Sequence, residues 1–257
     1  MSKIYITGDT HGDFRHISFF HNRKKVLNND DILIILGDAG LNYYVDKIKA
    51  WDVKDDGIRY RCDFRNLDMK KSLSDSLPAT VFCVHGNHEA RPQTIEGYKE
   101  KVWHSGKVLF QEEFPTLLFA KDGEIYNFNG NDYIVIGGAY SVDKQYRLKM
   151  TRLGREDYNW FDDEQPSEDT KRKVEDVLAR RNWKIHGILS HTCPYRHIPR
   201  ELFLPGIDQS RVDDSTERWL DLIEEKTEYS IWYFGHYHGE KNIENMRMLF
   251  RTIETLR

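Results

Sequence analysis

The amino-acid sequence predicts an α/β protein, and three observations support this prediction. Short runs of β-branched and aromatic residues end abruptly at or near glycine, segments with helical spacing lie between them, and polar residues follow most of the runs. The runs are apolar throughout instead of alternating, as expected of strands that are buried on both faces. Strands of this kind that alternate with helices are typical of α/β architectures.

Six runs of bulky apolar residues are expected to form strands. Ile4-Tyr5-Ile6 is typical, because it consists of β-branched and aromatic residues and a glycine follows two positions later. A glycine after a strand lets the backbone turn sharply and approach a compact site. The expected strands are residues 4–6, 32–36, 81–84, 133–136, 187–189 and 231–234.

Four segments between these runs have helical spacing: residues 14–26, 67–77, 170–182 and 213–226. The third follows acidic residues and ends near Arg180 and Arg181, which complements the helix dipole. Residues 42–66 and 141–165 lack such a pattern, and long irregular segments in compact domains are often lids or binding loops. We expect the first of these to be a surface insertion. No repeat or linker divides the chain, so the sequence predicts a single domain over residues 1–257.

The composition of the 257 residues argues against several classes of protein. No apolar run approaches the roughly 20 residues of a membrane span, and the first residues enter a strand pattern directly, so we expect a cytoplasmic protein without a secretory leader. The net charge of −4 argues against a long nucleic acid as partner. Cys62, Cys83 and Cys193 are widely spaced, so neither a disulfide framework nor a thiolate zinc site is indicated.

Polar residues that can bind a metal follow five of the six predicted strands. They occur in Gly8-Asp9-Thr10-His11-Gly12, Gly37-Asp38, Gly86-Asn87-His88-Glu89, Ser190-His191 and Gly235-His236-Tyr237-His238-Gly239. Ligands of α/β sheets bind at the carboxyl ends of the strands, so these side chains are expected to converge. One such motif alone would more often be a turn or a structural histidine, but five in this arrangement indicate one site.

The types of donor in these motifs indicate the class of metal. Aspartate, asparagine and histidine without thiolate suit divalent ions such as Mn, Fe, Zn or Co, and a shared carboxylate can bridge two of them. The histidines outside the motifs are expected to be structural: His16, His21, His85, His104, His186 and His197.

The five motifs, in this order, resemble those of the calcineurin-like metallophosphoesterase superfamily. They read GDTHG, GD, GNHE, SHT and GHYH, and span residues 8–239. The resemblance implies a four-layer α/β/β/α sandwich with two central mixed β-sheets and a metal site at the carboxyl ends of strands. Residues 137–144 and 232–238 further resemble a bacterial and phage subgroup, a likeness that names no substrate.

The resemblance also implies two divalent cations per chain, with Mn expected first and Fe, Zn, Co or Ni as alternatives. The ligands it implies are Asp9, His11 and His238 for the first cation, Asp38 as a bridge, and Asn87, His191 and His236 for the second. His88 would face the leaving group, and Glu89 would support the ligands.

A pair of cations implies direct attack on the phosphate ester. Two cations lower the pKa of a bridging water and neutralise charge on the phosphoryl oxygens, so hydroxide would attack phosphorus without a covalent intermediate. His88 would then protonate the leaving group as general acid. Arg147 and Lys144, which follow the Gly137-Gly138 turn, are expected to bind the substrate phosphate, although a solvated charged loop is an equal alternative.

The substrate stays open between a phosphodiester, such as a nucleotide or short oligonucleotide, and a phosphomonoester. Tyr140, Tyr146, Trp160 and Phe161 could stack on a base, although such aromatic residues are more often core. A protein Ser/Thr phosphatase is less favoured, because Leu41 and Asn42 replace the Asp and Arg of that branch. A metal-binding interaction scaffold is the other alternative, and the complete ligand set argues against it.

Overall fold

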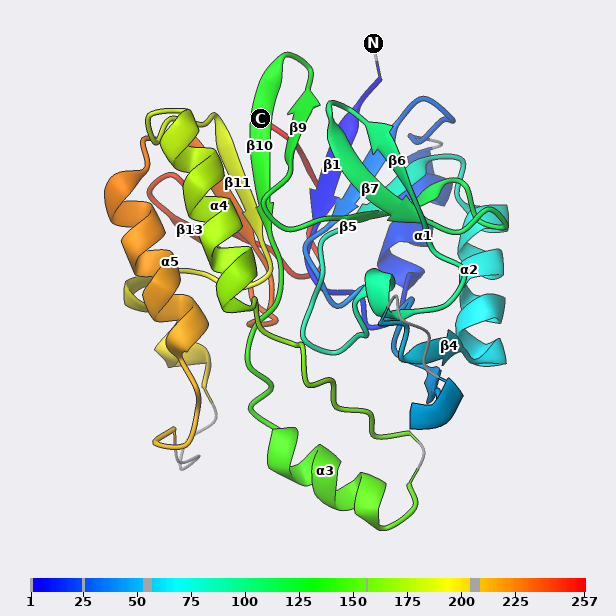
Figure 1. Cartoon of the computed structure of the whole chain (residues 1–257). Helices are drawn as coiled ribbons and strands as arrows, with labels where there is room; N and C mark the ends of the chain where they lie inside the picture. Colours follow the sequence, from blue (N-terminus) through cyan, green and yellow to red (C-terminus); the bar gives the residue numbers. More distant parts are fainter. Residues whose placement is uncertain (1, 25, 53–56, 156, 204–208) are drawn as a thin grey trace.

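In the computed structural model, two large β-sheets lie between helices (Figure 1). The structure describes residues 2–24, 26–52, 57–155, 157–203 and 209–257. In the described residues, the first sheet has seven strands in the order β15 (Glu254–Thr255), β1 (Ile4–Thr7), β2 (Ile32–Ile35), β5 (Thr80–Cys83), β8 (Leu117–Ala120), β7 (Gly106–Phe110) and β6 (Lys99–Trp103). Strands β1, β2, β5 and β8 are parallel, so their carboxyl ends lie at one edge.

The second sheet is also mixed. Its six described strands follow the order β13 (Lys241–Ile243), β14 (Met246–Met248), β12 (Ile231–Phe234), β11 (Gly187–Ser190), β10 (Asn131–Ile136) and β9 (Ile125–Phe128). Strands β10, β11, β12 and β14 are parallel. The six strands predicted from sequence are therefore all present, with ends that differ by at most two residues.

The apolar strands are buried on both faces because each packs against two different layers. In β2, Ile34 lies in the core between the two sheets, whereas Leu33 and Ile35 lie in the core under the helices. Successive side chains of a strand point to opposite faces, so a strand buried on both sides is apolar at every position. This explains the continuous apolar runs of the sequence.

Helices cover the outer face of each sheet, which completes four layers. On the first sheet these are α1 (Arg15–Lys24) and α2 (Phe64–Ser76), and on the second α4 (Glu168–Arg180) and α5 (Ser215–Lys226) (Figure 1). The apolar stripe of α5, with Trp219, Leu220 and Ile223, packs with Trp232 of β12. The predicted α/β/β/α sandwich with two mixed sheets is confirmed. No helix in the described ranges is long and apolar enough to cross a membrane.

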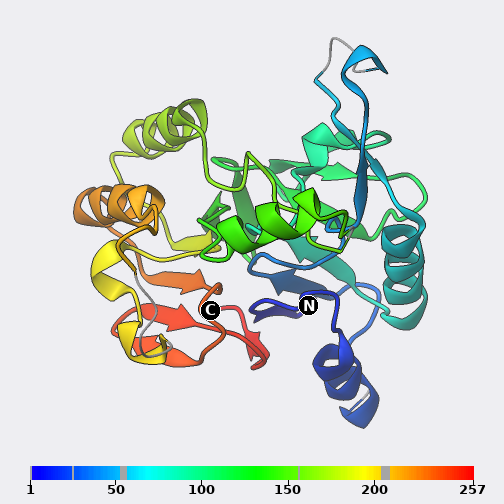
Figure 2. The same cartoon turned by 90° about the horizontal axis from the view of Figure 1, so that it is seen from below.

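The two segments expected to be irregular contain secondary structure. Residues 42–66 hold a hairpin of β3 (Val45–Lys47) and β4 (Tyr60–Cys62), with the short helix η1 (Ala50–Asp52) between the strands; residues 53–56 lie outside the described residues. Residues 141–165 contain α3 (Lys144–Arg152). The expectation of an irregular segment was wrong here because none of the nine described residues of α3 is buried, so the helix has no apolar stripe that its sequence could reveal. Figure 2, which looks onto the carboxyl edge of the sheets, shows α3 lying across the middle of the molecule.

Candidate metal centre

Turns after strands of both sheets bring the predicted ligands together. Four of them have left-handed backbone conformations: His11 (φ 48°), Asp38 (φ 45°), His236 (φ 67°) and His238 (φ 50°). Such a conformation costs a residue other than glycine about 1–2 kcal/mol. Strained backbone of this kind is concentrated at functional sites, where the surrounding structure holds it.

Two buried carboxylates lie at the middle of the site, and each is fixed through one oxygen. The backbone N–H of His236 donates to Asp9 Oδ1 (2.8 Å), and that of His88 donates to Asp38 Oδ1 (2.7 Å). Neighbouring glycines make this possible: a Cβ on Gly235 would lie 2.2 Å from Asp9 Oδ1, and one on Gly86 would lie 2.0 Å from Asp38 Oδ1.

The second oxygen of each carboxylate is available to a cation. Asp9 Oδ2 and Asp38 Oδ2 are buried and have no hydrogen-bond partner among the described residues. Burial acts to raise the pKa of both carboxyls, but His191 and other nearby histidines hold each pKa below its usual value. Buried ionised oxygens without partners are costly unless a positive charge faces them.

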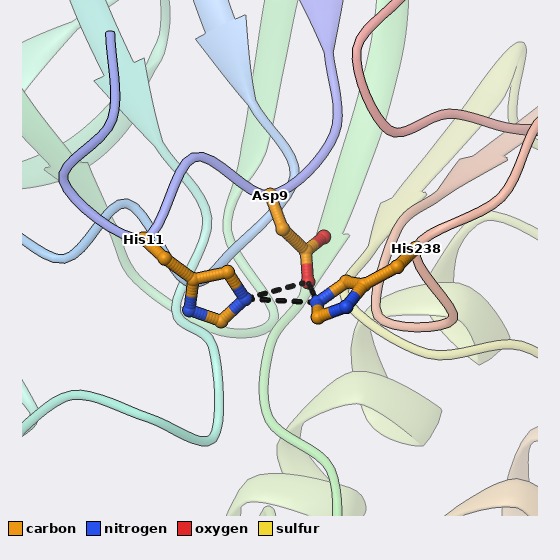
Figure 3. Close-up of side chains that lie close together, drawn as sticks. All are labelled: Asp9, His11 and His238. Atoms are coloured by element: carbon orange, nitrogen blue, oxygen red, sulfur yellow. Dashed lines mark hydrogen bonds and ion pairs between the residues drawn. The ribbon is translucent and has the colours of Figure 1, made fainter.

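The first group of ligand atoms comprises Asp9, His11 and His238 (Figure 3). Asp9 Oδ2 lies 3.8 Å from His11 Nε2 and 3.4 Å from His238 Nε2. The two imidazole nitrogens are 2.8 Å apart. The three side chains come from the ends of β1 and β12, one in each sheet, so the site joins the two halves of the molecule.

The second group comprises Asp9, Asp38 and His191, with Asn87 beside it. Asp38 Oδ2 lies 3.6 Å from His191 Nε2, and 3.9 Å from His11 Nε2 of the first group. His191 Nδ1 lies 2.8 Å from the carbonyl oxygen of Leu36, which can only accept, so Nδ1 donates there and Nε2 is left to face the carboxylate.

Asn87 presents an acceptor oxygen to His191 Nε2. Its Nδ2 donates to Ser141 Oγ (2.9 Å), which turns Oδ1 toward His191 Nε2 at 2.8 Å. In the unprotonated form that binds a metal, His191 Nε2 and Asn87 Oδ1 are both acceptors, and a cation next to both would hold them at this distance. Together with the two unpartnered carboxylate oxygens, this donor set fits divalent cations.

His236 lies beside the second group without belonging to either cluster of ligand atoms in the described residues. Its ring centroid is 5.0 Å from that of His191. Burial, with a contribution from His191, lowers the pKa of His236 to about 3. The ring is therefore neutral, the form in which histidine binds metals.

His88 and Arg147 meet in a cavity of about 170 Å³, which His11, Tyr43 and Tyr44 also line. The rings of His88 and His11 have centroids 5.6 Å apart. Burial lowers the pKa of His88, and the charge of Asp38 opposes this shift. His88 Nδ1 is buried without a hydrogen-bond partner among the described residues, so the structure shows no side chain that orients this ring.

The two predicted phosphate-binding residues lie in different surroundings. Arg147 donates to Asp143 Oδ2 (2.7 Å) and to Tyr43 Oη (2.9 Å), which holds its guanidinium at the cavity wall. Lys144 does not line this cavity, and its ammonium lies 4.3 Å from the ring centroid of Trp160.

Three further residues hold the site in place. The sequence predicted only a general supporting role for Glu89, and none for Ser141 and Tyr43. Glu89 Oε1 accepts from the backbone N–H groups of Ala39 and Gly86 (both 3.4 Å), so it joins the turns that carry Asp38 and Asn87. Ser141 orients Asn87, and Tyr43 orients Arg147, but single polar residues in loops give no sequence signal for such contacts.

Leu41 and Asn42 stand where the protein Ser/Thr phosphatase branch has Asp and Arg. Leu41 is buried in the core, and Asn42 Oδ1 accepts hydrogen bonds from Lys70 and Tyr98.

The family model described as calcineurin-like phosphoesterase matches residues 2–240. The chain belongs to the calcineurin-like phosphoesterase family. This calcineurin-like phosphoesterase is therefore a metal-dependent hydrolase that acts on phosphate esters, and its family binds divalent metals. The resemblance inferred from the five motifs is confirmed.

Two solved structures are similar to the chain at low sequence identity. A protein of unknown function from Aquifex aeolicus shares 14% identity with a TM-score of 0.33, over 77% of this chain and 82% of that chain. The phosphopantetheinyl hydrolase of Mycobacterium tuberculosis shares 13% identity with a TM-score of 0.41, over 97% of this chain and 88% of that chain. No curated protein matches the chain.

Proposed function

We propose that this phosphoesterase uses two divalent cations, with manganese preferred, and that hydroxide attacks the phosphate ester directly. The main support is the pair of buried oxygens, Asp9 Oδ2 and Asp38 Oδ2, which face imidazole nitrogens and accept no hydrogen bond from the described residues. The proposed ligands are Asp9, His11 and His238 for one cation, and Asn87, His191 and His236 for the other, with Asp38 between them. Bound divalent cations supply a hydroxide nucleophile at neutral pH and neutralise charge on phosphoryl oxygens.

His88 and Arg147 are proposed to act on the substrate itself. His88 would donate a proton to the leaving-group oxygen, since it lies in the wall of the cavity that borders His11. Arg147 would bind a phosphoryl oxygen in the same cavity, held in place by Asp143 and Tyr43. No contact within the described ranges supports a similar role for Lys144, so its part in phosphate binding stays a prediction.

The proposed substrate is a phosphorylated small molecule or nucleotide, with a phosphoprotein as a less favoured alternative. The net charge of −4 supports a small substrate over a long nucleic acid, whose binding usually requires an excess of basic residues. A diester carries two organic groups on phosphorus and a monoester only one, so the cavities around the site bear on which of them is the substrate.

The test is to remove metal with a chelator, add back manganese and measure bound metal and hydrolysis together. We expect two manganese ions per chain and hydrolysis of p-nitrophenyl phosphate or bis(p-nitrophenyl) phosphate, with neither in Asp38→Asn. Full activity in Asp38→Asn, or activity that does not depend on added metal, would contradict the proposal.

A further inference from the structure

Two cavities border the predicted metal ligands and differ in size. The smaller, of about 170 Å³, contains His88 and Arg147 in its wall, and the larger, of about 590 Å³, contains His236 and His238. His11 lines the smaller cavity, and its Nε2 lies 2.8 Å from His238 Nε2. The two cavities therefore approach each other at the metal centre, on either side of this pair of histidines.

The two cavities differ in the size of the substrate group that each can accommodate. Pockets for organic ligands typically have volumes of about 300–1,000 Å³. The larger cavity falls within this range, whereas the smaller one is below it. The smaller cavity therefore suits a phosphoryl group with a small leaving group, and the larger one has room for a substantial organic group.

The larger cavity is lined mainly by aromatic and aliphatic side chains. They include Tyr140, Val142, Tyr195, Leu202, Phe203 and Tyr237. The side chains of Val142 and Leu202 are 68% and 48% exposed, so a bound apolar group would cover apolar surface that now faces water. Arg200 and Glu217 add polar atoms that can fix the orientation of such a group.

The wall of this cavity is tied to the segment that carries two metal ligands. Tyr237, between His236 and His238, stacks on Phe203 with ring centroids 6.3 Å apart and an angle of 27° between the planes. The Tyr237 hydroxyl lies 2.9 Å from Thr192 Oγ1. Leu202 packs against Gly239, because a Cβ on that glycine would lie 2.5 Å from Leu202 Cδ1. An organic group bound here is therefore held at a fixed place relative to the metal centre.

The position of His88 decides which part of the substrate enters which cavity. A general acid must lie beside the leaving-group oxygen, so the leaving group belongs to the small cavity. A monoester has no other organic group and would leave the large cavity without a substrate group. We infer that the substrate is a phosphodiester whose retained group is apolar and contains a ring, bound between the walls formed by Leu202, Phe203 and Tyr237.

This inference rests on the proposed function, and it specifies the products. Hydroxide forms a new bond to phosphorus, the bond from phosphorus to the leaving-group oxygen breaks, and His88 gives that oxygen its proton. One diester and one water therefore yield a phosphomonoester of the retained group and a small alcohol or phenol.

The experiment keeps the leaving group constant and varies the retained group. Manganese-loaded protein is given four p-nitrophenyl esters of phosphate, in which the retained group is absent, ethyl, phenyl or thymidine 5′-yl. We expect kcat/KM for the phenyl and thymidine diesters to exceed that for the ethyl diester by at least about tenfold, the effect of burying a ring-sized apolar group. A thymidine diester much faster than the phenyl diester would identify the retained group as a nucleoside; the reverse order would identify a purely apolar group.

Two leucines of similar exposure provide a matched pair of variants. Leu202 lines the cavity and is 48% exposed, whereas Leu222 on α5 is 52% exposed and does not line it. Leu202→Ser should lower the phenyl-to-ethyl ratio of kcat/KM by at least about threefold, and Leu222→Ser should leave it as in the wild type. At this exposure, the replacement of either leucine should leave the fold intact.

Two results would overturn the inference alone: equal kcat/KM for all three diesters, or faster hydrolysis of the monoester than of any diester. Hydrolysis of none of the four esters by protein with bound manganese would contradict the proposed function together with the inference. An unchanged phenyl-to-ethyl ratio in Leu202→Ser would show that the ring does not bind at this wall.

Discussion

The two groups of predicted metal ligands differ in their exposure to solvent. In the first group, the side chains of His11 and His238 are 33% and 49% exposed. In the second, His191 is fully buried and Asp38 is 1% exposed. Asp9 belongs to both groups, and Asp38 Oδ2 of the buried group also lies 3.9 Å from His11 Nε2 of the open group, so both carboxylates lie between the two groups.

The two groups also differ in the hydrogen bonds that orient their ligand side chains. The ligands of the buried group are oriented by hydrogen bonds, from His191 to the carbonyl of Leu36 and from Asn87 to Ser141. In the open group, no backbone carbonyl or hydroxyl among the described residues orients His11 or His238 in this way; left-handed backbone next to a glycine occurs in both groups, at His11 and His238 and also at Asp38. We therefore expect the cation of the buried group to be retained more firmly, and that of the open group to exchange readily and to meet the substrate first.

The largest expected effect is that of removing the carboxylate that faces both groups. Asp38 Oδ2 lies within 4 Å of His11 Nε2 and His191 Nε2, at 3.9 Å and 3.6 Å. Asp38→Asn should abolish both hydrolysis and the binding of the two cations. Metal content and initial rates on the same samples would check this, and retention of two metals with wild-type rates would refute the shared role of Asp38.

Loss of His88 should separate proton transfer from metal binding. His88→Ala should retain both cations and lose about 10²-fold or more in kcat with an alkyl or phenyl leaving group, and much less with p-nitrophenolate, which needs no proton. Steady-state rates on phenyl phosphate esters and p-nitrophenyl esters would measure the difference. If the variant loses its metals, His88 is a ligand and not the general acid.

Replacing one histidine in each group compares the groups directly. His238→Ala should release one cation and change the melting temperature little, since its side chain is half-exposed. His191→Ala should release the buried cation and also destabilise the protein, because it leaves a cavity and an unpaired carbonyl of Leu36. Metal content and thermal unfolding of both variants give the answer; equal destabilisation would mean that the two groups do not differ.

The smallest expected effect is that of the hydrogen bond behind Asn87. Ser141→Ala removes the acceptor that fixes the Asn87 amide. Residues that hydrogen-bond to a metal ligand typically contribute about 10–100-fold to metal affinity. We therefore expect Ser141→Ala to lower the affinity for one of the two cations by a factor near the lower end of this range. A manganese titration of the metal-free variant would measure it, and weakening of both cations alike would argue against the assignment of Asn87 to the buried group.

Much of the fold and the site could be predicted because both depend on local sequence. The strand Ile32–Ile35 is apolar at each position since it is buried on both sides, and the ligand motif follows at a turn that needs glycine. The edge strand Lys99–Trp103 was not predicted, because its charged side chains are exposed and its pairing with Gly106–Phe110 is not visible in its own composition.

The supporting contacts of the site could not be predicted for a different reason. Ser141 and Asn87 are far apart in the sequence, as are Tyr43 and Arg147, and their hydrogen bonds exist only once the two sheets have packed together. Helix α3 places Arg147 at the small cavity, but none of its described residues is buried, so its sequence has no apolar pattern from which the helix could be predicted.

The most direct test of the central claim is anomalous X-ray diffraction from crystals grown with manganese. We predict two peaks, one in contact with Asp9, His11 and His238, and one in contact with Asp38, Asn87, His191 and His236. The Asp38 carboxylate should touch both. A single peak at full occupancy, or two peaks that do not share a carboxylate, would contradict the account of a dinuclear centre built from a buried and an open group.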